Sequence, residues 1–559
     1  MSELTWSQRG IWELQHQIWP EHHYFNSARL LSAPRGSTLT DVEDAFRWLV
    51  ETYEAFRTTV RRDPGGVPRQ HVTAVGQYPL DLHEVGAADP ASVAGRLARE
   101  YRGHAFADEE WPLRAAVVTC AGAPAYVLLT ASHLAVDRWG MRVACAALAD
   151  RLAARAGQPP PPAGAKATRQ PVDQAEAEAS PAGRRLAEQA ARYWRRGLRA
   201  IPQTMFPYEP AQAADRWCLT GELRTSAAAL AADALATRHG TPAPVVILAA
   251  TAALLGLRTG NMTVAMRLLA SNRHEAEVRE MVGTCVQPAL FAVDLGDISF
   301  HELIVRSRQS AAAAYRHARY PAPLIDEITH EINVCRGISA DLLCHFRDGT
   351  DATTRMAGPV WDVGEIAAAR SRSRFRSGAL FGARQKFVLE VSGRLGAELR
   401  LFLAADRGYL SLADVRTLVH GIETVLIEAV RRDFCLAEAA RLTGVAPVGR
   451  SPTAVRVDRC WVEPAAVARL LGEVPGVVAA QAEVVGGQDG CRLVGRVAVQ
   501  DASLDTARLH QEVIRRLRGR PAAMAPQYYL IHLAEGQALA DPGALPLCCE
   551  GPGREVYNP

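Results

Sequence analysis

Apolar residues return along this chain with two different spacings, and this mixture constrains the fold more than any other feature. At residues 42–50 and 141–152 they recur every three or four positions, as on the buried face of a helix. At residues 126–129 and 386–391 they form short apolar runs, which are typical of buried strands. Helices and strands in one chain predict an α/β or α+β protein, and they exclude a helical bundle or a β-sandwich.

A proline-rich stretch separates the first part of the chain from the rest. Residues 157–164 contain four consecutive prolines, which cannot pack, so a linker is predicted at 157–172. After it, Ser180 and Pro181 are suited to the N-cap and first position of a helix, which is predicted to run through Trp194. The predicted domains are residues 1–172, which include the linker, residues 173–440, and a small unit at 449–559.

Charge and cysteine content limit the classes of function. The formal net charge is +3, too close to balance for a general nucleic-acid binder. Only two lysines occur, Lys166 and Lys386, which restricts any mechanism that needs a lysine. The 11 cysteines include no pair at CxxC spacing, and no zinc-binding pattern is present. We therefore expect reduced thiols, no metal and a cytoplasmic protein.

No membrane segment is expected from the sequence. The N-terminus lacks a basic region followed by an apolar one, so no export signal is predicted. The longest apolar stretch, at 245–257, is shorter than the roughly 20 residues that a spanning helix needs. This stretch is predicted to form a buried core helix instead.

One segment, at residues 130–140, has the residue types for proton transfer. It lies between a predicted strand and a predicted helix, where a side chain points out of the end of a sheet. His133 can gain and lose a proton near neutral pH, and Asp137 could hold the turn together or orient the imidazole. Taken alone this pattern is weak, because a hydrogen-bonded structural histidine fits it as well.

Five segments of the chain, taken together and in order, resemble nonribosomal peptide synthetase condensation domains. Residues 132–139 fall where that family has its His-His-x-x-x-Asp-Gly signature, with His133 at the second histidine. The common order of the five segments is more specific than any one of them. They are Leu4–Trp12; Tyr53–Val60 with Gly66, Pro68 and Gln70; Ser132–Trp139; Ser271–Arg273 with Met281–Gln287; and Tyr320–Leu324.

The resemblance implies a fold and a reaction. The fold has two lobes, each like chloramphenicol acetyltransferase, that form a V with a central tunnel. Donor and acceptor groups arrive on the phosphopantetheine arms of carrier proteins, and an amine attacks the donor thioester. The resemblance places His133 at the centre of the tunnel, as base or amine positioner. It also implies a structural salt bridge between Asp137 and Arg273.

The chain departs from the family pattern at positions expected to line the tunnel. Ser132 stands where the first histidine is usual, and a serine can still hydrogen-bond within the turn. Arg138 replaces a glycine, so it narrows the tunnel, turns outward or admits a charged substrate. Gln287 replaces an asparagine, and it is expected near the substrate together with Trp139. These changes predict an unusual substrate, or a relative without catalytic activity.

Residues 449–546 resemble the small C-terminal subdomain of adenylation domains, beginning with the run Gly449–Val467. The position of that family's hinge aspartate holds Pro452, and the position of its invariant lysine falls near Gly543 and Ala544. Because no lysine occurs in this segment, adenylation is not expected. The subdomain is either a vestigial module that docks other synthetase enzymes or a cap that stabilises the second lobe.

Carrier proteins are the expected partners. The chain contains no Gly-Gly-x-Ser-Leu carrier motif, so the thioester is expected on another protein. A basic loop is predicted at Arg370–Arg376, with an arginine at every second position. It could bind an acidic carrier protein or the phosphate of its arm, or it could be a solvated loop.

These observations predict a free-standing condensation enzyme. It would form an amide, or an ester, between an acyl or aminoacyl group on a carrier protein in trans and an amine acceptor. Two alternatives stay open: an inactive platform that recruits enzymes to a synthetase, and an acyltransferase that uses a soluble amine or alcohol. No permanently bound cofactor, metal, nucleic acid or membrane is expected, and phosphopantetheine is expected only on the carrier protein.

Overall fold

The structure, a computed structural model, is built from two compact units whose segments are separate in the sequence. Unit 1 consists of Met1–Ala191, Ala270–Pro288 and His317–Ile325, and unit 2 of Arg192–Leu269, Ala289–Arg316 and Asp326–Pro559. The linker prediction falls largely outside the described residues, and Pro171 within it opens a helix. The structure describes residues 2–74, 76–86, 89–155, 169–211, 217–350, 361–381, 385–487, 490–500, 503–534 and 542–553.

A four-stranded sheet forms the centre of unit 1, with the strand order β2-β7-β6-β5. Strand β7 pairs antiparallel with both of its neighbours, whereas β5 pairs parallel with β6. The strand predicted at 126–129 is confirmed as part of β7, in the interior of the sheet. The strands are β2 (Ser27–Ser32), β5 (Leu80–Val85), β6 (Leu113–Cys120) and β7 (Ala123–Ala131), with β1 (Ser2–Glu3), β3 (Thr58–Arg62) and β4 (Pro68–Val72) in a second, small sheet.

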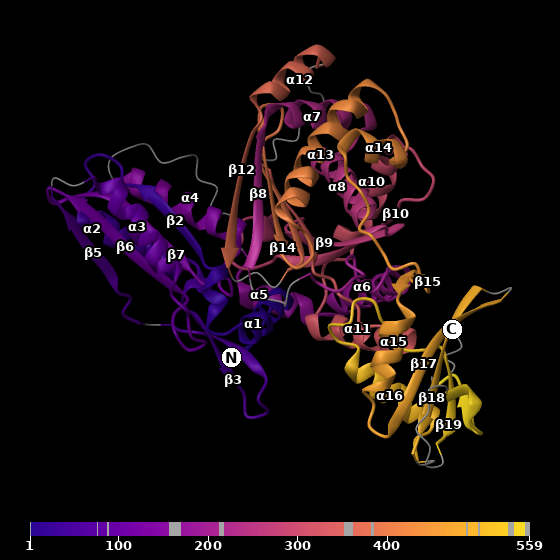
Figure 1. The fold of residues 1–559 in the computed structure, drawn as a ribbon. Coiled ribbons are helices and arrows are strands. Elements are labelled where there is room, and N and C mark those ends of the chain that lie inside the picture. The colour runs from indigo at the N-terminus through magenta and orange to yellow at the C-terminus, as the bar shows by residue number, and fades with distance from the viewer. Residues whose placement is uncertain are drawn as a thin grey trace. The chain divides into compact units, whose positions relative to one another are not determined.

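Helices cover both faces of the four-stranded sheet (Figure 1). On one face, Phe46 of α2 and Met141 of α4 share a buried core with Leu129 of β7. On the other face, Leu97 of α3 packs with Leu128, because successive residues of a strand point to opposite sides. The helices predicted at 42–50 and 141–152 are confirmed as α2 and α4. The helices are α1 (Trp6–Gln17), α2 (Leu39–Thr52), α3 (Pro90–Arg102), α4 (Arg138–Arg155) and α5 (Pro171–Ala179).

A seven-stranded sheet forms the centre of unit 2, with the strand order β10-β9-β11-β13-β14-β8-β12. The run predicted as a strand at 386–391 is confirmed, since β13 begins at Phe387. Strand β12 lies at one edge of the sheet and pairs with β8 alone. The loop predicted at 370–376 is therefore wrong in part, because residues 370–372 form a 3₁₀ helix and 374–376 begin this strand. The strands are β8 (Trp217–Thr225), β9 (Thr263–Ala270), β10 (Gln287–Asp294), β11 (Cys344–Thr350), β12 (Arg374–Phe381), β13 (Phe387–Arg394) and β14 (Glu398–Asp406).

The helices of unit 2 pack on this sheet and on one another. α13 and α7 contact β8 and β14, and the apolar stretch at 245–257 forms the buried helix α8, as predicted. Ser180 caps α6, which begins at Pro181 as predicted, and its Oγ accepts a hydrogen bond from the Gly183 amide at 3.2 Å. The helices within unit 2 are α7 (Ser226–His239), α8 (Ala243–Thr259), α10 (Phe300–Arg316), α12 (Val363–Ala369), α13 (Leu412–Arg431) and α14 (Leu436–Thr443). Two helices, α6 (Pro181–Ala200) and α11 (Ala322–Arg336), begin in unit 1 and end in unit 2.

The C-terminal part of unit 2 is a small α+β subdomain, as predicted, with its own sheet in the order β17-β18-β19-β20 (Figure 1). Arg336 ties it to the rest of the unit, because its Nε lies 2.8 Å from Asp458 Oδ2. Its adenylation-domain ancestry stays a prediction. Its elements are β15 (Val455–Val457), β16 (Cys460–Val462), α15 (Pro464–Gly472), β17 (Val477–Gly487), β18 (Gly490–Val499), α16 (Thr506–Arg516), β19 (Tyr528–Leu533) and β20 (Leu547–Gly551).

The described helices of this protein differ from membrane spans in length or hydropathy. Within the described ranges, no single helix is long and apolar enough to cross a bilayer. α7 and α8 meet the criterion only as a pair, and a bend of 105° separates them.

Candidate active site

The loop between β7 and α4 carries most of the predicted site residues. β7 ends at Ala131, and the chain turns at once: the amides of Ala135 and Val136 both donate to the Ser132 carbonyl, at 3.1 and 3.2 Å. The turn is short because the interior strand β7 and the buried helix α4 fix its two ends. Residues 132–137 are therefore held on both sides by packed elements.

Ser132 closes this turn with its side chain. Its Oγ accepts hydrogen bonds from the Leu134 amide at 3.3 Å and from Gln15 Nε2 of α1 at 3.4 Å. Ser132 is buried, and its own amide donates to the Pro112 carbonyl at 2.9 Å. The serine thus performs the turn-holding role that its residue type allowed, and it joins α1 to the loop.

His133 is half-buried, and its ring is oriented by the backbone of its own turn. Nδ1 lies 3.3 Å from the Val136 carbonyl oxygen. A neutral ring with its proton on Nδ1 has its lone pair on Nε2. The ring of Phe25, on the short 3₁₀ helix Glu21–Phe25, stands at a centroid distance of 6.1 Å.

Asp137 fixes the loop to the segment 270–288 of the same unit. Its Oδ1 accepts from Arg273 Nη2 at 2.9 Å and from the Gly140 amide at 2.7 Å. Its Oδ2 accepts from the Cys285 amide at 2.9 Å. Among the described residues no hydrogen bond joins Asp137 to His133. Of the two roles considered for Asp137, the geometry supports holding the turn rather than orienting the imidazole.

Arg273 is the cationic partner of Asp137, and both side chains are deeply buried, at 2% and 6% exposure. The guanidinium also donates to three backbone carbonyls, those of Val278, Met281 and Gly283, at 2.7 to 2.9 Å. A buried ion pair is tolerated when hydrogen bonds also satisfy its remaining donors, and here the two Nη atoms are satisfied in this way, whereas Nε is buried without a partner among the described residues. Hydrogen bonds to the guanidinium of Arg273 and the carboxylate of Asp137 therefore hold the backbone of the segment 273–285 in place.

Gly140 permits the close approach of α4 to this segment. A Cβ atom at position 140 would lie 2.6 Å from the Gly283 carbonyl oxygen and 2.8 Å from Val136 Cγ2. Such contacts are shorter than van der Waals distances, so only glycine fits without displacement of the backbone. The sequence pattern did not single out this glycine.

Arg138 and Trp139 are the first residues of α4, and both are exposed. Trp139 Nε1 donates to the Arg279 carbonyl at 2.9 Å, and the guanidinium of Arg142 lies 3.8 Å from the centroid of its ring. Arg138 thus faces solvent in this structure, which is one of the alternatives considered for it. Contact of either residue with substrate stays a prediction.

Gln287 lies on the far side of the segment that Arg273 organises. Its Nε2 donates to the Tyr320 carbonyl at 2.7 Å, and its Oε1 accepts from Asn272 Nδ2 at 3.4 Å. Asn272 adopts a left-handed φ of 55° and also donates to the carbonyls of Cys285 and Ala318, both at 3.1 Å. The buried amide of Gln287 therefore secures the segment itself, and its contact with substrate stays a prediction.

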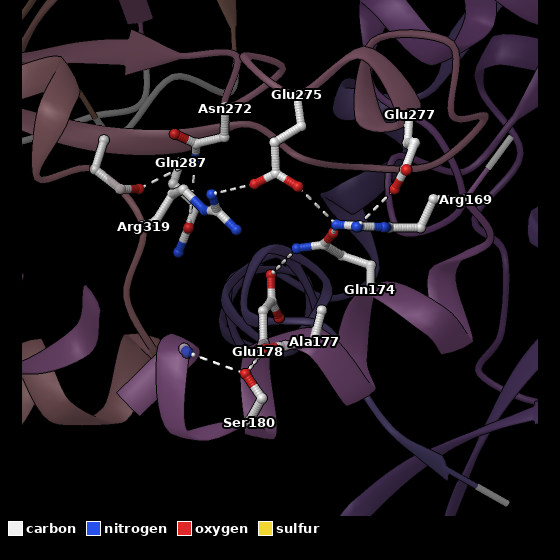
Figure 2. A network of polar contacts seen from close by, with 12 residues as sticks. Arg169, Gln174, Ala177, Glu178, Ser180, Asn272, Glu275, Glu277, Gln287 and Arg319 are labelled. Atoms are coloured by element: carbon white, nitrogen blue, oxygen red, sulfur yellow. Dashed lines mark hydrogen bonds and ion pairs between the residues drawn. The ribbon is translucent and has the colours of Figure 1, made fainter. Parts of the chain in front are cut away.

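A polar network that the sequence did not indicate surrounds Glu178 on α5 (Figure 2). Its Oε1 accepts from Gln174 Nε2 at 2.8 Å, and its Oε2 from the Trp6 amide, at the start of α1, at 2.6 Å. Burial raises the pKa of Glu178 to about 7, against the opposing effect of these hydrogen bonds. Nearby, Glu275 pairs with Arg169 at 2.9 Å and with Arg319 at 2.8 Å.

Cys285 contacts Asp137 through its backbone amide. Burial raises the pKa of the Cys285 thiol to about 12, so the side chain is a protonated thiol at neutral pH. A thiol in that state is a poor nucleophile. His133 is therefore the group in this loop that can carry out acid–base chemistry, with Ser132 and Asp137 committed to holding the turn.

The comparisons with known proteins agree with this geometry. A family model described as Condensation domain matches residues 1–334. The phosphinothricin tripeptide synthetase PhsC of Streptomyces viridochromogenes is 27% identical over 370 residues, which cover 63% of this chain and 33% of that protein. The chain spans about a third or less of the length of the curated relatives it matches.

Solved structures show the same fold at low sequence identity. The first condensation domain of the calcium-dependent antibiotic synthetase is 18% identical, with a TM-score of 0.55, over 77% of this chain and 96% of that chain. The condensation domain described for chain release from the enacyloxin polyketide synthase is 19% identical, with a TM-score of 0.59, over 80% and 84%. The predicted fold class is thereby confirmed, whereas the tunnel between the lobes stays a prediction.

Proposed function

The chain belongs to the condensation-domain family, and we propose that it joins an acyl group, held as a thioester, to an amine. The thioester would be carried on the phosphopantetheine arm of a carrier protein. His133 would accept the proton that the amine loses. The observation that carries this proposal is the fixed imidazole at the end of β7, on a loop that a buried ion pair secures.

The proposed reaction is acyl transfer. The amine nitrogen attacks the thioester carbonyl, the C–N bond forms and the C–S bond breaks, so that an amide and a free thiol result. The proton from nitrogen goes to Nε2 of His133 and can then pass to the departing sulfur. A positioned general base contributes about 10²–10⁴-fold to such a step. Delivery of both reactants to one site supplies a further, entropic share.

The orientation of the ring supports this role. The Val136 carbonyl faces Nδ1 at 3.3 Å, which favours the tautomer with its lone pair on Nε2. Because the carboxylate of Asp137 is turned to Arg273, it does not form a His–Asp pair that would retain a proton on the imidazole. An imidazole with its lone pair on Nε2 is suited to receive a proton from an amine.

A kinetic comparison tests the proposal. The chain is supplied with acyl-loaded carrier protein, or with an acyl pantetheine thioester, and a set of amines, and products are followed by mass spectrometry. We expect His133→Ala to lower the single-turnover rate by about 10²–10⁴-fold. His71→Ala is the matched control, since His71 is a half-buried histidine on β4. Unchanged turnover in His133→Ala would remove this residue from the mechanism.

A further inference from the structure

The edge strand β12 carries a concentration of positive charge that the proposed reaction does not use. Arg374 and Arg376 on the strand, Arg372 in the turn before it and Arg416 on α13 are all exposed. We call these four arginines the basic edge. In the described part of the chain none of them forms an ion pair. They therefore leave four positive charges beside a single strand.

The register of the sheet explains why these side chains are exposed. Phe375 packs beside His420 at a centroid distance of 5.4 Å, and so turns toward the helix α13. Successive residues of a strand point to opposite faces, so Arg374 and Arg376 must project from the other face. Arg416 lies over the ring of Phe375 at 4.7 Å. The basic edge thus surrounds β12 on both faces.

Farther into the same sheet, arginines are paired with carboxylates. In the adjacent rows, Arg224 and Arg400 both bind Glu222, at 2.9 and 2.7 Å. Glu398 and Glu390 lie within 4 Å of the same two arginines. Arg374 stands directly opposite Arg224 across the strand pair, an arrangement of like charges that costs stability. Arg376 stands opposite Glu222, whose carboxylate Arg224 and Arg400 already bind. An anionic partner on the basic edge would relieve this repulsion.

Charged side chains on edge strands also prevent strands of other molecules from pairing with them. A single lysine or glutamate is enough for that purpose, whereas this edge has four arginines, none of which forms an ion pair among the described residues. The arginine fork matches the two oxygens of a carboxylate, and a row of such groups fits a helix that presents aspartate and glutamate. The chemistry of the edge therefore fits an acidic protein surface.

We propose that the basic edge docks an acidic helix of the carrier protein that delivers the acyl group. This inference rests on the proposed function, which supplies the carrier. The arginines would recognise the protein surface, and the phosphopantetheine arm would not be needed for the contact. Charge pairs of this kind accelerate encounter and weaken as salt is added.

Equilibrium binding to the full chain tests the proposal. The probe is a fluorescently labelled acyl carrier protein with an acidic helix, purified without its phosphopantetheine arm. The test variant is Arg374→Glu with Arg376→Glu, which keeps the edge charged and so retains its protection against strand pairing. The control variant is Arg185→Glu with Arg518→Glu, two exposed arginines elsewhere, which changes the net charge by the same amount.

We expect the test variant to raise the dissociation constant at least about tenfold at low salt, and the control to change it less than about twofold. Equal changes in both variants would overturn the inference. So would binding by the wild-type chain that requires the phosphopantetheine arm, because the phosphate would then be the ligand. A neutral variant, Arg374→Gln with Arg376→Gln, should lie between the wild type and the charge reversal.

A second readout separates this inference from the proposed function. Turnover of a small acyl pantetheine thioester needs His133 but no protein docking, so the test variant should retain the wild-type rate. Suppose that this turnover depends on His133, but that the test variant binds the carrier protein as tightly as the wild type does. The docking proposal then fails, and the proposed function stands. If carrier binding depends on the basic edge while no turnover occurs, the docking stands and the function fails.

Discussion

Replacement of Asp137 by alanine removes the acceptor of three hydrogen bonds at the centre of unit 1. The Arg273 guanidinium, with only 2% of its side chain exposed, would lose its counter-charge. The amides of Gly140 and Cys285 would lose their acceptor as well. Removal of one member of a buried ion pair costs about 3–5 kcal/mol, because the other charge stays buried and unpaired. We therefore expect Asp137→Ala to lower the free energy of unfolding by about 3–5 kcal/mol.

Urea denaturation followed by tryptophan fluorescence and circular dichroism measures this change. Asp44→Ala is the matched control, because Asp44 forms half-exposed ion pairs with Arg47 and Arg155 at 3.2 and 3.1 Å. Such pairs contribute about 1 kcal/mol or less. Asp137→Asn should recover little, since its amide nitrogen must face one of the donors that the carboxylate accepts from. A loss below about 1 kcal/mol for Asp137→Ala would refute the reasoning.

Two further substitutions test other parts of the unit. Between pH 4.5 and about 7 the folded protein keeps a proton on Glu178 that the unfolded chain releases, so this group lowers stability as pH rises through that window. Thermal melts across pH should show the stability of Glu178→Gln rising relative to wild type by up to about 3 kcal/mol between pH 4 and pH 8; a difference between the two proteins that does not depend on pH would contradict this. Gly140→Ala forces a methyl group against Gly283 and should cost about 1–3 kcal/mol and reduce turnover, as melts and rate measurements would show. Gly472→Ala, where a Cβ meets open space, is its control, and equal effects of the two would contradict the packing argument.

Local patterns were sufficient to predict the elements that position His133. The apolar residues of α4 recur at helical spacing because one face of the helix is buried, and β7 is continuously apolar because both of its faces are covered. The turn between them follows from the end of one element and the start of the next. The salt bridge between Arg273 and Asp137 is implied by the resemblance to the family, and the two side chains are hydrogen-bonded in the structure.

Burial that depends on distant segments could not be predicted in the same way. Glu176 and Glu178 both lie between alanines in the sequence, yet Glu176 is exposed and Glu178 is buried. Glu178 lies beside the start of α1, where the backbone amide of Trp6 donates a hydrogen bond to its carboxylate, although the two residues are far apart in the sequence. No spacing within the helix α5 carries that information, because it depends on tertiary contacts.

The domain boundaries illustrate a related limit. Changes of composition predict boundaries at single points along the chain, whereas the structure assembles each unit from separate segments. The segment 270–288 follows strand β9 of unit 2 and yet contributes Arg273 to unit 1. Composition marks a linker but gives no sign of a segment that belongs to another unit.

Affinity labelling is the most direct test of the claim that the His133 imidazole meets the acyl thioester. Bromoacetyl pantetheine places an electrophilic carbon close to the position of the thioester carbonyl, and peptide mapping by mass spectrometry locates the alkylated residue. We predict that Nε2 of His133 is alkylated and that an acyl pantetheine substrate protects it. Exposed cysteines such as Cys435 and Cys491 can also react, but substrate should not protect them. Absence of protected label from His133 would contradict the account.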